Sequence, residues 1–196
     1  MTADMREYII PVLKRAVADP ETVSTRLLER FGTVSKLAFA DYDELLAVEG
    51  MNEGAALILR LSFSLAARCE TDKFKLNVKH TEEEIVSYLK ALFFSLSNET
   101  VYLLTLDSEG RVTSSEYMGE GTVNSSSVLP RKLLEVAIKK RASSVILAHN
   151  HPMGVATPSV DDIEVTSTIA SLFRASEREL LCPYVIAGDK HYKIEI

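Results

Sequence analysis

The stretch ILAHNHPMGVATPSVDDIEVT, residues 146–166, joins a predicted strand to a predicted helix through a loop rich in Pro and Gly. The apolar, branched residues that lead to His149 predict a short strand buried on both faces. Ser159 and Asp162 form a Ser-x-x-Asp pattern, which is typical of the first turn of a helix. His149 and His151 stand at the end of the strand, where side chains two residues apart project to the same side.

These four residues support two interpretations. In the first, the loop brings Asp162 back beside the two histidines, and the three side chains bind one metal ion. Two imidazoles and one carboxylate leave a fourth tetrahedral position open, as in catalytic zinc sites. In the second, Ser159 and Asp162 only cap a helix, and His149 and His151 only end a strand. A capping residue can also bind a metal, and the conjunction of strand end, short loop and helix start favours the metal site.

Strands and helices alternate on both sides of this stretch. Strands are predicted at residues 100–107, 111–121, 143–149, 180–188 and 192–196, and helices at residues 82–94, 129–141 and 159–179. Thr81 and Glu84 form a Thr-x-x-Glu capping box at the start of the first of these helices. The alternation predicts an α/β fold with a mixed sheet flanked by helices.

The first third of the chain shows no strand pattern. Apolar residues recur at helical spacing in residues 5–18, where Pro11 predicts a break or kink, and Gly32 predicts the end of a second helix. A short helix, a tight turn from Gly50 to Gly54 and a long apolar helix follow. We therefore predict a helical domain at residues 1–69, a polar linker at 70–80 and the α/β domain at 81–196.

The composition is that of a folded globular protein. The 196 residues suffice for one ordinary domain or two small ones. No apolar run reaches the roughly 18 residues that span a bilayer, and the N-terminus lacks a signal-peptide pattern, so we expect a cytoplasmic protein without a membrane partner. Cys69 and Cys182 have no CxxC partner and are predicted to be free thiols. The net charge of -6 argues against a protein that coats nucleic acid.

The spacing His-x-His-x7-Ser-x2-Asp at His149, His151, Ser159 and Asp162 resembles the metalloprotease motif of JAB/MPN domains. Within that superfamily, the form HNHP-G---PS--D resembles the RadC family, once named for DNA repair. Residues 121–152 and 27–59 are similar to further RadC segments, the latter to a helix-hairpin-helix region. The resemblance implies a cytidine-deaminase-like sheet after a small all-α domain, with one Zn²⁺ per chain. Deaminase chemistry is disfavoured, because the chain lacks the His-x-Glu and Pro-Cys-x-x-Cys patterns.

The resemblance also implies two catalytic residues. In JAB/MPN domains, a glutamate near the first sheet strand acts as general acid and base, and Glu99 in SNETVYLLTLD falls at that position. Ser159 is similar to the family serine that stabilises the developing oxyanion. The alternatives stay open that Glu99 is a solvated residue at a strand start and that Ser159 is only a helix cap. His80, before a helix cap, and His191, in a polar turn, are expected to lie outside the site.

Two segments depart from the RadC pattern. A helix-hairpin-helix holds a DNA phosphate on backbone N–H groups, usually through Gly-h-Gly and a following basic residue. In VEGMNEGAA, residues 48–56, the candidate DNA contacts are Gly50, Asn52 and Gly54, but Glu49 and Glu53 would repel a phosphate. RadC relatives often carry Asp-His where this chain has Pro183 and Tyr184, which leaves the inferred metal ligands untouched.

Three hypotheses follow for the function. The first is a zinc-dependent hydrolase of the JAB/MPN class that acts on a peptide or isopeptide-like amide in a peptide or protein substrate. The second is a nucleic-acid binding or processing protein, which the acidic hairpin disfavours. The third is a non-catalytic interaction module, although such modules typically lose the metal ligands that this chain keeps. Two imidazoles and a carboxylate suit zinc, with iron and manganese as alternatives.

Overall fold

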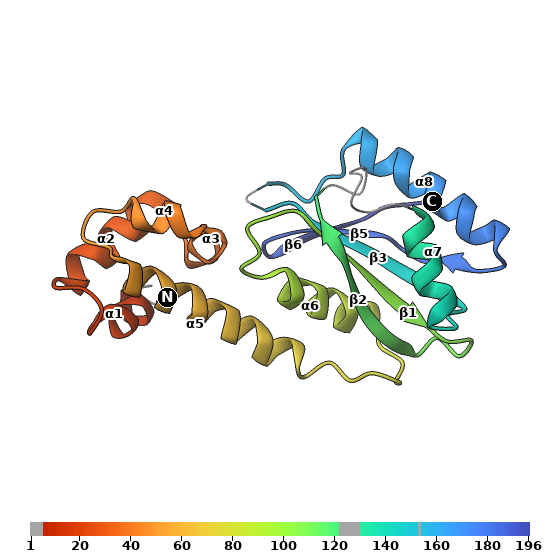
Figure 1. The fold of residues 1–196 in the computed structure, drawn as a ribbon, viewed down its shortest axis with the longest axis horizontal. Coiled ribbons are helices and arrows are strands. Elements are labelled where there is room, and N and C mark those ends of the chain that lie inside the picture. The colour runs from red at the N-terminus through yellow and green to blue at the C-terminus, as the bar shows by residue number, and fades with distance from the viewer. Residues whose placement is uncertain (1–5, 122–129, 153) are drawn as a thin grey trace.

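The computed structural model describes residues 6–121, 130–152 and 154–196, and within them six strands form one mixed sheet (Figure 1). The strands are β1 (Thr100–Leu106), β2 (Val112–Glu120), β3 (Ser144–Asn150), β4 (Glu179–Leu180), β5 (Tyr184–Ala187) and β6 (Lys190–Lys193). Their order is β2-β1-β3-β5-β6, and β4 pairs with β3. β3 is antiparallel to β1 but parallel to β4 and β5, which makes the sheet mixed as predicted.

Helices cover both faces of the sheet (Figure 1). α6 (Glu82–Phe93) packs on one face against alternate strand residues such as Leu104 and Ile146. α7 (Pro130–Lys139) and α8 (Val160–Ala175) pack on the other face, against Leu103 and Leu147 among others. The predicted α/β class with flanking helices is therefore confirmed, and each central strand is buried on both faces.

The alternation of strand side chains selects the residues that meet at one end of the sheet. Val101 of β1 and Leu147 of β3 both face α7 and α8. Glu99 precedes Val101 by two residues, and His149 follows Leu147 by two, so both continue on the face covered by α8. Val101 and His149 are also direct partners in the antiparallel register. The strand pattern thus directs Glu99 and His149 toward the N-terminal end of α8.

The N-terminal part of the chain is helical. It consists of α1 (Arg6–Leu13), α2 (Pro20–Phe31), α3 (Val34–Phe39), α4 (Tyr42–Leu46) and α5 (Glu53–Thr71) around their own apolar core. α5 extends from this core toward the sheet, where it contacts α6 (Figure 1). The ring of Phe94 meets Phe39 and Phe63 edge to face, with centroid distances of 6.0 and 6.2 Å. The division at residues 69 and 80 and the helix-hairpin-helix assignment remain predictions.

Several local predictions need correction. α1 passes through Pro11 and ends at Leu13, so the helix is shorter than the predicted 5–18. The single strand predicted at 180–188 is divided between β4 and β5, because Pro183 has no N–H to contribute to a ladder. The turn predicted at His191 is wrong, since this residue pairs with Ile186 within β6. Residues 122–129, which fall in the RadC-like segment 121–152, lie outside the described residues.

Membrane-spanning helices are not found in the described part of the chain. None of its helices combines sufficient length with sufficient apolarity to cross a bilayer.

Candidate metal centre

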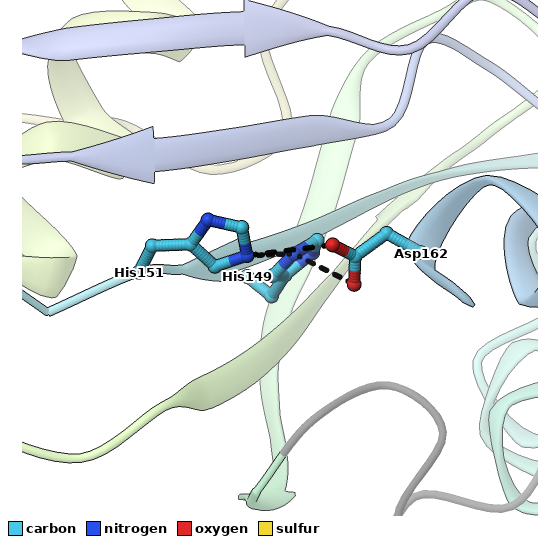
Figure 2. Close-up of side chains that lie close together, drawn as sticks. All are labelled: His149, His151 and Asp162. Atoms are coloured by element: carbon cyan, nitrogen blue, oxygen red, sulfur yellow. Dashed lines mark hydrogen bonds and ion pairs between the residues drawn. The ribbon is translucent and has the colours of Figure 1, made fainter. Parts of the chain in front are cut away.

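His149, His151 and Asp162 converge at the end of β3 (Figure 2). The Nε2 atoms of the two histidines lie 3.1 Å apart. His149 Nε2 lies 3.3 Å from Asp162 Oδ1, and His151 Nε2 lies 3.4 Å from Asp162 Oδ2. Zinc binds imidazole nitrogen and carboxylate oxygen at about 2.0–2.2 Å, so two ligand atoms of a tetrahedral site are separated by about 3.3 Å. The two histidine nitrogens lie near this separation, and each faces one oxygen of Asp162, so the three side chains could hold a single metal ion.

The orientation of His151 is fixed by the loop that follows it. Its Nδ1 lies 2.9 Å from the backbone carbonyl of Val155, an acceptor, so Nδ1 carries the hydrogen that is donated. In the neutral ring this leaves the lone pair on Nε2, which faces His149 and Asp162. A Cβ added to Gly154 would lie 3.2 Å from His151 Cβ, so Gly154 lies close against His151. A backbone carbonyl that sets the tautomer of a ligating histidine is a usual feature of metal sites.

Ser159 and Asp162 form the capping box at the start of α8. The backbone N–H and the hydroxyl of Ser159 donate to Asp162 Oδ2 at 2.8 and 2.7 Å. The backbone N–H of Asp162 donates to Ser159 Oγ at 3.1 Å. The same carboxylate that closes this cap also faces the two histidines, so the capping and metal-binding interpretations describe one arrangement.

Asp162 is held in its ionised form. Its side chain is buried, and burial raises the pKa of the carboxyl group. Hydrogen bonds with His149 and with the hydroxyl and amide of Ser159 outweigh this effect and hold the pKa of Asp162 well below its usual range. A negatively charged acceptor that is already desolvated is suited to bind a cation.

Glu99 lies at a pocket beside these residues. The pocket has a volume of about 530 Å³, and its lining residues are Glu99, His151, Pro152, Gly154, Val155, Ser159, Asp161 and Asp162. Glu99 is half-buried and immediately precedes β1. The structure therefore brings the predicted general base and the predicted serine to one pocket with two of the predicted ligands.

The other two histidines lie outside the site. The ring of His80 stacks on Phe74 at 3.9 Å, and its two nitrogens contact Glu84 and the carbonyl of Lys75. His191 is exposed on β6.

One residue of the site was missed in the sequence. Asn150 is only the variable residue of the His-x-His pattern, yet it is 2% exposed, and its side chain bonds to the backbone of Asn98 and Thr100. The available signal was an amide side chain at the end of a strand whose other residues are apolar. A buried amide requires hydrogen-bond partners, but the sequence does not show where these partners lie.

The candidate DNA contacts have structural roles. Gly50 adopts φ 91°, and a Cβ there would lie 2.7 Å from Val23 Cγ2. Asn52 caps α5 by accepting from the N–H of Ala55 at 2.9 Å, and its own amide donates to the carbonyl of Ala16 at 2.6 Å. Gly54 lies in the first turn of α5. DNA contact by these three residues remains a prediction.

The fold and the site together define a mixed α/β domain with a His-His-Asp group that could hold a metal ion. A profile of the family described as the RadC-like JAB domain matches residues 79–194, which is more than half of the chain. The chain belongs to this family.

Similar proteins from several bacteria bear the name UPF0758 protein. That of Cupriavidus pinatubonensis is 34% identical over 163 residues, which cover 83% of this chain and 72% of that protein. That of Desulforudis audaxviator is 34% identical over 174 residues, with 87% and 74% covered. That of Staphylococcus carnosus is 31% identical over 171 residues, with 87% and 75% covered.

Proposed function

We propose that the protein is a zinc-dependent hydrolase that cleaves a peptide or isopeptide-like amide bond. The observation that carries this proposal is the set of separations of 3.1, 3.3 and 3.4 Å among the ligand atoms of His149, His151 and Asp162. A pocket that also contains Glu99 lies beside them. When bound, zinc would supply Lewis acidity, which polarises a carbonyl and lowers the pKa of a water molecule to about 7.

Glu99 is the proposed general base and acid. One oxygen of its carboxylate would accept a proton from the attacking water and later donate that proton to the leaving nitrogen. Its place at the pocket and its continuation of the strand face that carries His149 support this role. This side chain is half-buried, so it is both accessible to substrate and partly shielded from bulk water.

Ser159 is the proposed oxyanion donor, and this role requires a change in its hydrogen bond. Its single hydroxyl hydrogen is donated to Asp162 Oδ2 at 2.7 Å. To stabilise an oxyanion, the hydroxyl would rotate away from Asp162 and donate to substrate instead. The backbone N–H of Ser159 would continue to support the carboxylate of Asp162 during this change.

The test combines metal analysis with substrate screening. Elemental mass spectrometry of zinc-reconstituted protein should find about one zinc per chain, as a His₂-carboxylate site implies. A library of peptides and isopeptide-linked conjugates is then screened with the parent, with Glu99→Gln and with Glu109→Gln, which alters a glutamate in the turn after β1. Turnover should fall by about 100-fold or more in Glu99→Gln and persist in Glu109→Gln. A folded protein that binds no zinc, or turnover that is unchanged in Glu99→Gln, would contradict the proposal.

A further inference from the structure

Asn150 makes two hydrogen bonds to the backbone on either side of Glu99. Its Oδ1 accepts from the backbone N–H of Thr100 at 2.7 Å. Its Nδ2 donates to the backbone carbonyl of Asn98 at 3.2 Å. Asn150 itself is almost fully buried, so neither bond is readily replaced by water.

These bonds lie where the pairing between β1 and β3 ends. The last pair in the register is Val101 with His149. Beyond it, β3 keeps its pairing with β5 on the opposite edge, where the N–H of His151 donates to the carbonyl of Ile186 at 2.8 Å. The Asn150 amide continues the contact toward β1 with the same kind of donor and acceptor that a peptide group would provide.

The backbone around Glu99 is therefore held from two sides. On the β3 side, Asn150 binds the peptide groups of Asn98 and Thr100. On the β2 side, the N–H of Gly121 donates to the carbonyl of Glu99 at 2.8 Å. Glu99 itself lines the pocket that His151 also lines.

We propose that Asn150 is a positioning residue, whose side-chain amide fixes the backbone on both sides of Glu99 and thereby holds the Glu99 carboxylate beside the metal centre. Because Asn150 lies between His149 and His151 in the chain, one short stretch of β3 supplies two ligands and also places the general base. A misplacement of about 1 Å in a catalytic group can cost roughly 100-fold in rate, so such support matters. This inference rests on the function proposed for Glu99.

The first experiment tests the contact itself in the metal-free protein of 196 residues. Amide hydrogen exchange of Thr100 is followed by NMR in the parent, in Asn150→Ala and in Asn98→Ala. The Asn98→Ala variant removes a side chain that donates to Glu120 Oε2 at 3.1 Å, but it keeps the carbonyl that Asn150 binds. Exchange at Thr100 should become about tenfold faster in Asn150→Ala and stay unchanged in Asn98→Ala. Equal rates in all three proteins would overturn the proposal.

The second experiment tests the effect on Glu99 with Co²⁺ as the probe. The visible absorption of bound Co²⁺ depends on its surroundings, so it is recorded for the parent, Glu99→Gln, Asn150→Ala and the double variant. All four should bind one Co²⁺ per chain, because the three ligands are kept. Asn150→Ala should reproduce the spectral change of Glu99→Gln. The double variant should differ little from either single variant, because the effects of residues that act as one unit are not additive.

The outcomes separate this inference from the proposed function. A spectral change in Glu99→Gln that is absent in Asn150→Ala, or that adds fully in the double variant, would overturn the role of Asn150 alone. No Co²⁺ binding, or no effect of Glu99→Gln, would overturn the proposed function and the inference with it. If Asn150→Ala does not fold, Asn150→Asp replaces it. This variant keeps the oxygen that accepts from Thr100 but loses the amide that donates to Asn98. The Co²⁺ spectrum should then change, while amide exchange at Thr100 should stay at the parent rate.

Discussion

The Nε2 atoms of His149 and His151 face each other at 3.1 Å, with both oxygens of Asp162 within 3.4 Å of the pair. A contact this short between two ring nitrogens requires a proton on one of them or a cation between them. Because the Nδ1 of His151 is engaged by the Val155 carbonyl, its Nε2 is free to act as an electron-pair donor. This arrangement is the basis for the predictions on metal binding.

Replacement of one histidine should abolish metal binding. His149→Ala leaves one imidazole and one carboxylate, which are too few for stable zinc coordination. We expect metal content to fall from about one zinc per chain to near zero in elemental analysis. His191→Ala, which alters an exposed histidine on β6, is the matched control and should keep the metal. Equal zinc content in both variants would contradict the assignment of the site.

Zinc should stabilise the folded chain. Free zinc at 100 times the dissociation constant adds about 2.7 kcal/mol to the free energy of unfolding if the unfolded chain does not bind it. For a chain of this size, that corresponds to a rise in Tm of about 5–10 °C. Differential scanning fluorimetry with zinc and then with EDTA measures the rise and its reversal. The His149→Ala protein should show neither, and a zinc effect of the same size there would indicate binding elsewhere.

Loss of the α8 cap should affect both stability and metal affinity. Ser159→Ala removes the hydroxyl that bonds to Asp162, which should cost about 1 kcal/mol in stability. It should also weaken zinc binding by about tenfold, because the ligand carboxylate loses a supporting hydrogen bond. Thr81→Ala removes the equivalent cap of α6 and should cost similar stability without a change in zinc affinity. Zinc titrations and thermal melts of both variants make this comparison.

The link between α6 and the sheet edge should weaken in acid. Lys193 and Tyr184 donate hydrogen bonds to Glu82. These bonds, of which that from Lys193 has the larger effect, lower the pKa of the Glu82 carboxyl group from the usual 4.5. A lowered pKa in the folded state means that the stabilisation is present above pH 4.5 and is lost as the pH falls through the folded value. The urea midpoint of the parent should therefore exceed that of Glu82→Gln at pH 7 and approach it in acid. When Lys193 is replaced by Met in both proteins, the difference between their urea midpoints at pH 7 should shrink. A difference between the parent and Glu82→Gln midpoints that stays constant with pH would contradict this view.

DNA binding should be absent at moderate salt. Glu49 and Glu53 flank the turn at the start of α5. Arg26, a cation beside this turn, is paired with Glu49 at 3.0 Å, and this pairing opposes its use for a phosphate. Carboxylates at this place repel phosphates, on which sequence-independent DNA affinity depends. Fluorescence anisotropy with single-stranded, duplex and branched DNA at about 150 mM salt should show no binding at micromolar protein. Binding in this range would instead favour the nucleic-acid hypothesis.

Local patterns in the sequence determined much of the sheet and the cap of α8. Branched apolar residues before His149 indicated a strand buried on both faces, and β3 is such a strand. The Ser-x-x-Asp spacing indicated the capping box, because the hydrogen bonds of a cap join residues three apart. These features depend on neighbours along the chain, so they can be inferred without tertiary structure. Strand breaks such as the one at Pro183 depend also on the partner strands, and there the prediction was wrong.

Only the tertiary structure decided how these pieces meet. The register that pairs Val101 with His149 is set by packing on both faces of the sheet, and it brings Glu99 to the pocket that His151 also lines. Thr100 and its partner Asn150 lie fifty residues apart in the chain. The bonds from Asn150 to Asn98 and Thr100 join residues 52 and 50 positions apart, so no local pattern reveals them. The sequence by itself therefore indicated which residues could bind a metal and where the central strands and the helices beside them lie. The fold determined which side chains share one pocket, because contacts between distant segments depend on the packing of the whole domain.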